Sequence, residues 1–114
     1  LVKVFGDNKY EELTADLTQA RIVGEQAALT VEDSGTCNLD GVFLRLKGFN
    51  EEKTISAILN SGMGGFKYSH KYFGIGYIIG FNAGQANKRA KAADTMYKYL
   101  RGLGYDVIHW QQMD

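Results

Sequence analysis

Few side chains in this chain have the types and spacing that catalysis or metal binding requires. The single cysteine, Cys37, has no histidine near it in the sequence, and His70 and His109 belong to different predicted elements. A nucleophilic cysteine needs an adjacent base, and a metal site needs more ligands at closer spacing. The acidic candidates are typical of a turn and a helix start: Asp40, Glu51 and Glu52. We therefore expect a protein that is not an enzyme and that uses no metal, cofactor or small-molecule substrate.

Residues 71–81 read KYFGIGYIIGF and place glycines among bulky apolar side chains. Gly74, Gly76 and Gly80 form G-x-G-x-x-x-G, which is one residue longer than the dinucleotide-binding fingerprint, and the residues after Gly76 alternate as a strand. The apolar run at 72–81 has ten residues, whereas a membrane-spanning helix needs about 18. Two interpretations stay open. The stretch is either a strand that binds nucleic acid or a sheet strand whose glycines admit a close neighbour.

A second candidate binding surface lies on the helix predicted for residues 85–101. Four cations spaced at three, seven and three residues share one face of it: Lys88, Lys91, Lys98 and Arg101. Such a stripe can contact phosphates, and an ordinary solvated face has the same pattern. Charge is also unevenly spread, with six basic and ten acidic residues in 1–60 but seven basic and three acidic in 61–114. This asymmetry can mark an anionic partner for the basic half.

Periodicity, capping residues and glycines predict the elements that position these side chains. A helix begins at residue 7 or 8 and ends at Gly24, and a strand follows at 27–32. The stretch from 42 to 47 alternates as a half-buried strand. The inward set is Val42, Leu44 and Leu46, and the outward set is Phe43, Arg45 and Lys47. The remaining elements are a helix at 50–62, strands at 66–69 and 75–81, the helix at 85–101 and a strand at 106–112.

From residue 42 onward this order is β-α-β-β-α-β, the split βαβ or ferredoxin-like arrangement of an α+β fold. Right-handed crossovers place both helices on one face of a four-stranded antiparallel sheet and leave the other face open. We expect one domain over 1–114, with an N-terminal extension at 1–41 and the split βαβ core at 42–112. The extension, a helix with a strand or hairpin, either extends the sheet or covers part of the open face.

Within this arrangement, the stretch from Gly74 to Ile78 resembles the core of the octamer motif of RNA-recognition motifs, which lies on the third strand of the same fold. In that family the two aromatic positions, here Ile75 and Tyr77, face the open sheet and stack on bases. A further aromatic is second in the first strand, where Phe43 stands in VFLRLK. The resemblance implies that Phe43 and Tyr77 form a stacking platform, that Ile78 points into the core, and that two cations meet phosphates: Arg45 and Lys47.

The favoured function is a binding module for single-stranded nucleic acid or a host nucleoprotein. The alternative is a protein-binding inhibitor or accessory factor, because small chains rich in aromatic and glycine residues are similar in general character to phage proteins such as anti-CRISPR inhibitors. GVFLR at 41–45 is also similar to the phosphate cradle of acylphosphatases, but the alternation at 42–47 indicates a strand there. One unpaired cysteine and the lack of a signal-like or membrane-spanning run indicate a cytoplasmic protein.

Overall fold

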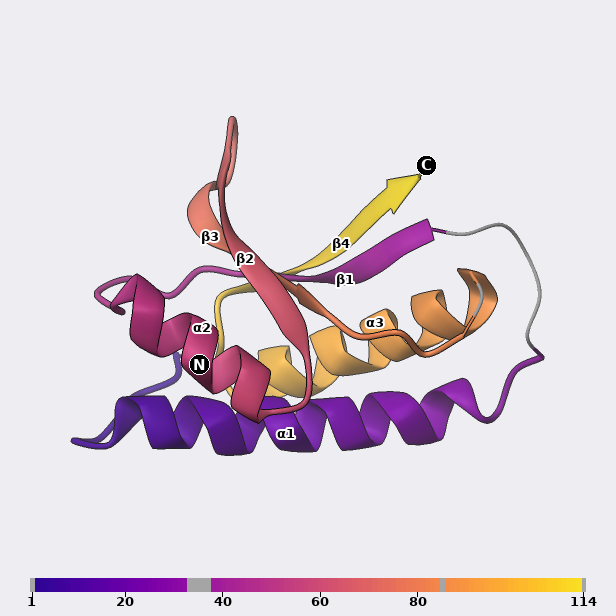
Figure 1. Ribbon diagram of the computed structural model, residues 1–114, viewed down its shortest axis with the longest axis horizontal. Coiled ribbons are helices and arrows are strands. Elements are labelled where there is room, and N and C mark those ends of the chain that lie inside the picture. The colour runs from indigo at the N-terminus through magenta and orange to yellow at the C-terminus, as the bar shows by residue number, and fades with distance from the viewer. Residues whose placement is uncertain (1, 33–37, 85, 114) are drawn as a thin grey trace.

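The computed structural model describes residues 2–32, 38–84 and 86–113, which form helices on one side of a sheet (Figure 1). The elements follow in the order α1 (Lys9–Ala28), β1 (Asn38–Leu44), α2 (Glu51–Asn60), β2 (Gly64–His70), β3 (Gly74–Gly80), α3 (Ala86–Gly102) and β4 (Val107–Met113). The α+β class and the succession of elements from the first sheet strand onward are therefore confirmed.

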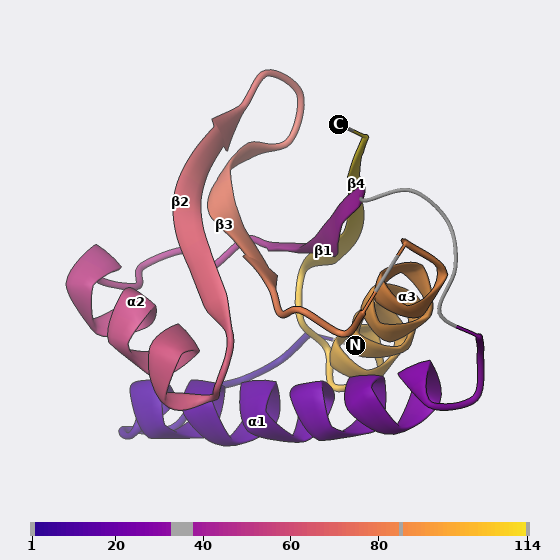
Figure 2. The same ribbon diagram turned by 45° about the vertical axis from the view of Figure 1, so that its right-hand side comes forward.

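The strands form one sheet in the order β2-β3-β1-β4, and each neighbouring pair is antiparallel. α2 packs on β2, while α3 packs on β1 and β4. α1 runs beneath both helices and contacts them as a further layer (Figure 1 and Figure 2). Within the described ranges no helix covers the opposite face of the sheet, which we call the open face.

The core lies between the sheet and the helices and is built from alternate strand positions. Val42 and Leu44 of β1 are fully buried there with Ile79 of β3. The helices contribute large apolar side chains with at most 1% of their surface exposed: Leu13, Leu17, Ile58, Met96 and Leu100. Full burial of such a side chain stabilises the fold by about 1.5–3 kcal/mol. The inward set predicted for the first sheet strand is confirmed.

α2 begins as its sequence predicts. The side chain of Asn50 accepts a hydrogen bond from the backbone nitrogen of Lys53 at 3.0 Å, and Glu51 and Glu52 occupy the first turn. These are the N-cap and the favourable acidic charges at the positive end of the helix dipole. Gly62 follows the helix with a positive φ of 87°, which glycine adopts without a steric penalty.

α1 differs from its prediction, because it continues past Gly24 to Ala28 and, with 20 residues, is longer than α3 with 17. A Cβ built on Gly24 would lie 3.0 Å from Cγ of Met96 and 3.3 Å from the carbonyl oxygen of Ala92. Gly24 therefore lets α1 and α3 approach closely and does not end the helix. The strand predicted at 27–32 is wrong, since its first two residues belong to α1 and the others form no strand.

The N-terminal extension consequently leaves the open face exposed. α1 contacts α2 and α3, which lie on the other side of the sheet (Figure 2). Residues 2–32 neither extend the sheet nor cover the open face, whereas residues 38–41 belong to β1. β1 also begins at Asn38, earlier than the predicted residue 42, because it pairs with β4 along its whole length.

Candidate binding surface on the open sheet face

The strand register determines which side chains reach the open face. Phe66 of β2 pairs with Ile78 of β3, Ile78 pairs with Phe43 of β1, and Phe43 pairs with Ile108 of β4. Directly paired residues of antiparallel strands point to the same side of a sheet. Since the neighbours of Phe43 in β1 face the helices, this row lies on the open face.

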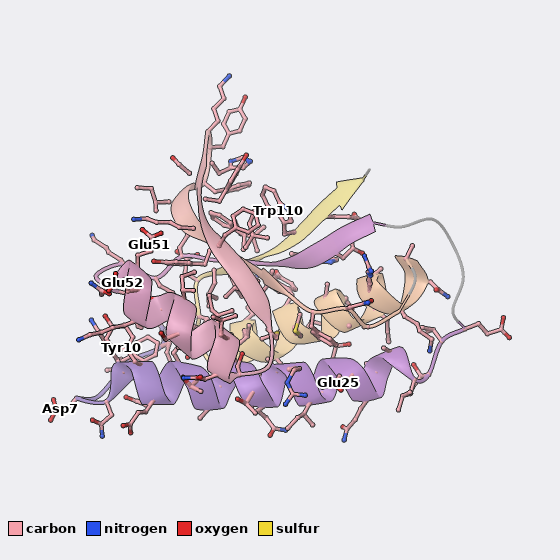
Figure 3. All side chains as sticks on the ribbon, in the orientation of Figure 1. Asp7, Tyr10, Glu25, Glu51, Glu52 and Trp110 are labelled. Carbon is pink, nitrogen blue, oxygen red and sulfur yellow. The ribbon has the colours of Figure 1, made fainter. Side chains whose placement is uncertain are left out.

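Four rings gather at the centre of the open face, and we call them the aromatic cluster: Phe43, Tyr68, His70 and Trp110. The ring of Trp110 lies 5.6 Å from that of Tyr68 and 5.7 Å from that of His70, between centroids. β4 and β2 are the edges of the sheet, and a flat sheet would hold such strands about 14 Å apart. Their side chains therefore reach toward one another over the open face, and Trp110 lies on the side of the sheet away from α1 (Figure 3).

Gly76 provides the space for these rings. A Cβ built on Gly76 would lie 2.6 Å from Cζ of Phe43 and 2.9 Å from the carbonyl oxygen of Leu44. The Phe43 ring thus lies against the bare backbone of β3, with Trp110 at 5.8 Å, and has no exposed surface. For Gly76, the interpretation of KYFGIGYIIGF as a strand that admits a close neighbour is the correct one.

The predicted stacking platform of Phe43 and Tyr77 is wrong. Tyr77 is 3% exposed and belongs to the core, whereas Ile78, predicted to be buried there, lies on the open face. The register is the cause, because it pairs Phe43 with Ile78 and Tyr77 with Leu44. Ile75 has the parity of Tyr77 along β3 and is 61% exposed near the start of the strand. Sequence spacing determines which residues share a face, but it does not determine which face meets the helices.

The exposed rings are on β2 and on the hairpin that joins it to β3. Phe66 is 55% exposed and Tyr68 is 39% exposed, and on the hairpin the values are 81% for Tyr72 and 40% for Phe73. Nδ1 of His70 shapes the hairpin by accepting hydrogen bonds from the backbone nitrogens of Tyr72 and Phe73, at 3.0 and 3.2 Å. These rings were not among the residues predicted from the sequence to bind a partner. The available signal was their alternation along GGFKYSH, which places Phe66, Tyr68 and His70 on one face.

Arg45 and Lys47 lie at the rim of the sheet, beside a pocket of about 450 Å³ that Ile75 also lines. Nη2 of Arg45 is 2.6 Å from Oδ1 of Asp106, and Nη1 donates to the carbonyl oxygen of Phe73 at 3.2 Å. These bonds direct the guanidinium along the rim, toward the protein's own acceptors. Lys47 is exposed. The assignment of phosphate contacts to Arg45 and Lys47 stays a prediction.

The predicted basic stripe of α3 combines a structural residue with exposed ones. Nζ of Lys88 donates to the carbonyl oxygen of Ala28, the last residue of α1, at 2.7 Å and to that of Val31, three residues further on, at 2.8 Å, and so caps that helix. The other three cations are exposed: Lys91, Lys98 and Arg101. Lys98 pairs with Asp94 at 3.0 Å, and Arg101 donates a hydrogen bond to the Tyr97 hydroxyl. Because α3 covers the other side of the sheet, this stripe does not join the open face.

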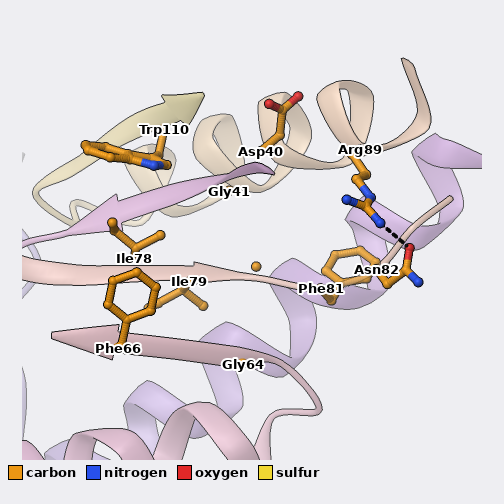
Figure 4. A pocket seen from close by; sticks show the side chains of 11 residues that line it. Asp40, Gly41, Gly64, Phe66, Ile78, Ile79, Phe81, Asn82, Arg89 and Trp110 are labelled. Carbon is orange, nitrogen blue, oxygen red and sulfur yellow. Dashed lines mark hydrogen bonds between the residues drawn. The ribbon is translucent and has the colours of Figure 1, made fainter. Parts of the chain in front are cut away.

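A pocket of about 330 Å³ opens beside the aromatic cluster, and we call it the glycine slot (Figure 4). Glycines from three adjacent strands line it: Gly64, Gly80 and Gly41. Gly64 pairs with Gly80, and a Cβ built on Gly80 would lie 3.6 Å from Cα of Gly41. Phe66, Ile78 and Trp110 stand at one end of the slot, and Arg89 and Asn82 stand at the other end together with the ring of Phe81. Asp40 also lines the slot, next to Gly41 in β1.

Hydrogen bonds fix the polar end of the glycine slot. Oδ1 of Asn82 accepts from Nη2 of Arg89 at 3.1 Å and from the backbone nitrogen of Gly84 at 3.2 Å. Nε of Arg89 donates to the carbonyl oxygen of Gly84 at 2.7 Å. With its oxygen accepting two bonds, Asn82 has its amide nitrogen as the donor for a further partner.

Asp40 and His109 lie on the helix side of β1 and β4. Asp40 is in a strand and not in the predicted turn. Burial raises the pKa of the Asp40 carboxyl, while the charges of His109 and Arg89 oppose that rise. Within the described residues, neither carboxylate oxygen of Asp40 nor Nε2 of His109 has a hydrogen-bond partner. The His109 ring stacks on Tyr97 of α3 with a centroid separation of 6.3 Å.

Comparisons of the chain with protein-family models, with curated proteins and with solved structures found no match. Over the ranges that the structure describes, no cluster of three or more His, Cys, Asp or Glu side chains could hold a metal ion. No helix in those same ranges has the length and apolar character needed to cross a membrane. Cys37 lies outside the described residues. The functional proposal therefore depends on the open face and the glycine slot.

Proposed function

We propose that this chain is a non-catalytic module that binds single-stranded nucleic acid on its open face, within a ferredoxin-like split βαβ fold. The strand order and the crossovers through α2 and α3 support the fold assignment. The observation that carries the functional proposal is the group of rings on the uncovered sheet face, with Phe66 and Tyr68 exposed beside Trp110. Rings on such a face are the platform on which unpaired bases stack.

The charge of the surrounding chain supports an anionic partner. Between residues 64 and 80 the sequence contains two lysines, Lys67 and Lys71, and no aspartate or glutamate, while the cations of α3 lie on the other side of the sheet. This segment includes β2, β3 and the hairpin with Lys71, whose Nζ lies 5.7 Å from the centroid of the Tyr72 ring. Each phosphate that such cations neutralise releases condensed counterions. Affinity for the strand should therefore fall as the salt concentration rises.

The proposed platform uses other residues than the resemblance to RNA-recognition motifs implied. Phe43 supports the platform from below, because Trp110 lies over it and it has no exposed surface. Tyr77 takes no part, since it is in the core. Arg45 and Lys47 are candidates for phosphate contacts at the rim. The bases would stack on rings of the edge strands instead of the central strands.

Trp110 is the only tryptophan of the chain and lies in the aromatic cluster, so its fluorescence reports on the open face. We expect a single strand of about 12 nucleotides to change this fluorescence at low salt. Phe66→Ala should weaken binding by about 5- to 150-fold, because one stacked base contributes ~1–3 kcal/mol. The matched control is Leu59→Ala, which removes a side chain of similar exposure, 61%, from α2 on the helix side.

Two results would contradict the proposal. Equal affinities of Phe66→Ala and Leu59→Ala would mean that the strand does not bind on the open face. A wild-type protein that leaves Trp110 fluorescence and oligonucleotide mobility unchanged at low salt would mean that it does not bind single strands. A duplex of the same sequence should bind more weakly than the single strand, because its bases are already stacked.

A protein-binding inhibitor or accessory factor of the phage type is the second candidate, and the position of β2 favours it. β2 is an edge of the sheet, and most of its residues are exposed. An exposed edge can accept a strand of a partner protein, with Phe66 and Tyr68 as side-chain anchors. A stoichiometric complex with one host protein that resists nuclease treatment and is lost in Phe66→Ala would favour this candidate over nucleic acid.

A further inference from the structure

We propose that the glycine slot binds one unstacked nucleobase of the strand, an inference that rests on the function proposed above. The slot has a volume of about 330 Å³, close to the lower limit of the ~300–1,000 Å³ that is typical of small-molecule sites. It therefore has room for one ring system. Phe66 belongs both to the exposed platform and to the lining of the slot, so one strand can reach both.

The shape of the slot suits a flat ligand. Gly64, Gly80 and Gly41 contribute only backbone to its lining, and they come from three adjacent strands. A Cβ built on Gly64 meets open space, whereas a Cβ on Gly41 would lie 2.4 Å from the carbonyl oxygen of Ile79 and one on Gly80 would lie 3.1 Å from that of Asp40. Gly41 and Gly80 thus let β1 and β3 approach closely, and a planar ring has room against the peptide groups at Gly64. The rings of Phe66 and Trp110 stand at the same end of the slot (Figure 4), where they can contact the faces or edges of a base.

The charges at the slot suit a neutral ligand. Asp40 and Arg89 both line the slot, and the charge of Arg89 acts on the Asp40 carboxyl. A phosphate placed there would be repelled by Asp40, and an ammonium group would be repelled by Arg89. A nucleobase is neutral and carries hydrogen-bonding groups along its edge. Asn82, oriented by its bonds to Arg89 and Gly84, offers its amide nitrogen to a ring nitrogen or carbonyl oxygen of that edge.

A side chain at Gly64 tests the slot directly. Gly64 lines the slot, and no described atom lies within 4 Å of a Cβ built on it. Gly64→Val therefore narrows the slot while leaving the packing of the core unchanged, and valine suits a strand. The matched control is Gly102→Val at the end of α3, which also has open space around its Cβ and no positive φ.

Titration of a strand of about 12 nucleotides against Trp110 fluorescence and by mobility shift gives the affinities. We expect Gly64→Val to bind about 5- to 150-fold more weakly than Gly102→Val, because one base loses its contacts. A second set of oligonucleotides, each lacking one base, tests the same contact by changing the ligand instead of the protein. In the wild type, loss of the base in the slot should weaken binding by a similar factor. In Gly64→Val the same loss should have no additional effect.

The outcomes separate the slot from the function on which it rests. If the wild type and Gly102→Val bind the strand and Gly64→Val binds it equally well, the slot proposal fails and the platform stands. If neither the wild type nor Gly102→Val binds the strand, both proposals fail. If Gly64→Val does not fold, the affinities of the wild-type protein for the strands that each lack one base test the slot proposal. Equal small losses at every position would then overturn the slot.

Discussion

Replacement of Gly76 by alanine should destabilise the protein, because the open face leaves no space for a methyl group there. The added Cβ would lie 2.6 and 2.8 Å from Cζ and Cε2 of Phe43 and 2.9 Å from the carbonyl oxygen of Leu44. The ring cannot move outward freely, since Trp110 lies at 5.8 Å and Phe43 has no exposed surface. The carbonyl belongs to the backbone of β1. Overpacking of this kind costs about 1–3 kcal/mol.

The same substitution at Gly64 should have the opposite sign. No described atom lies within 4 Å of its Cβ position, and its φ is not positive. Alanine at Gly64 should therefore stabilise the protein by ~0.4–1 kcal/mol, because it reduces the conformational entropy of the unfolded chain. The free energies of unfolding of Gly64→Ala and Gly76→Ala should then differ by roughly 1.4–4 kcal/mol.

Urea unfolding followed by circular dichroism measures this difference, and Trp110 emission adds a local reading because its ring lies near Phe43. Gly76→Ala should lower the urea midpoint with an unchanged m-value, and it should alter the emission of the folded protein. A Gly76→Ala variant as stable as the wild type would refute the packing of Phe43 against bare backbone.

Tyr77→Ala should lower the free energy of unfolding in urea by about 3–5 kcal/mol, because Tyr77 is 3% exposed in the core; a loss under about 0.5 kcal/mol would indicate a surface position. Asp40→Asn should raise the thermal midpoint at neutral pH, because the raised pKa of Asp40 means that the folded state disfavours the charged carboxyl. The cost of the charged carboxyl is absent below the ordinary pKa of 3.8 and lowers the stability of the wild type as pH rises above that value, so the higher thermal midpoint of the variant should vanish below that pH. A midpoint raised equally at every pH would contradict this explanation. Lys88→Ala should destabilise by about 1.5–3 kcal/mol, since its amine donates hydrogen bonds to the carbonyls of Ala28, at the end of α1, and Val31, just beyond it. Lys91→Ala, at an exposed position of the same helix, should change stability by less than about 0.5 kcal/mol, and equal losses would contradict the capping role.

Local rules predicted those elements whose causes lie within a few residues. Asn50 caps α2 through the backbone nitrogen of Lys53, as the residue types at that position indicate. Val42 and Leu44 face the core because a strand alternates with a period of two. Gly24 shows the limit of such rules. Glycine commonly ends helices, but Gly24 lies within α1, where the close approach of α3 leaves no space for a side chain.

The candidate site was predicted less well, because most of it is assembled from distant segments. The sequence placed Phe43 on the open face, where it lies, but not beneath Trp110. Phe66 and Tyr68 were recoverable from their alternation in β2. The contribution of Trp110 could not be predicted in this way, because its contact with Tyr68 forms only where side chains of the two edge strands meet over the sheet.

The sequence by itself determined the α+β class, the order of elements from β1 onward and the two sets of side chains along each strand. Helix caps, turn glycines and hydrophobic periodicity depend on residues close together in the sequence. The fold class, the element order and the two side-chain sets can therefore be predicted without knowing the tertiary structure. Only the tertiary structure decided that Tyr77 faces the helices, through its pairing with Leu44. It also decided that Lys88 caps a helix whose last residue, Ala28, is 60 positions earlier. The space open to each side chain, and hence which rings stay exposed, depends on how segments far apart in the chain pack together.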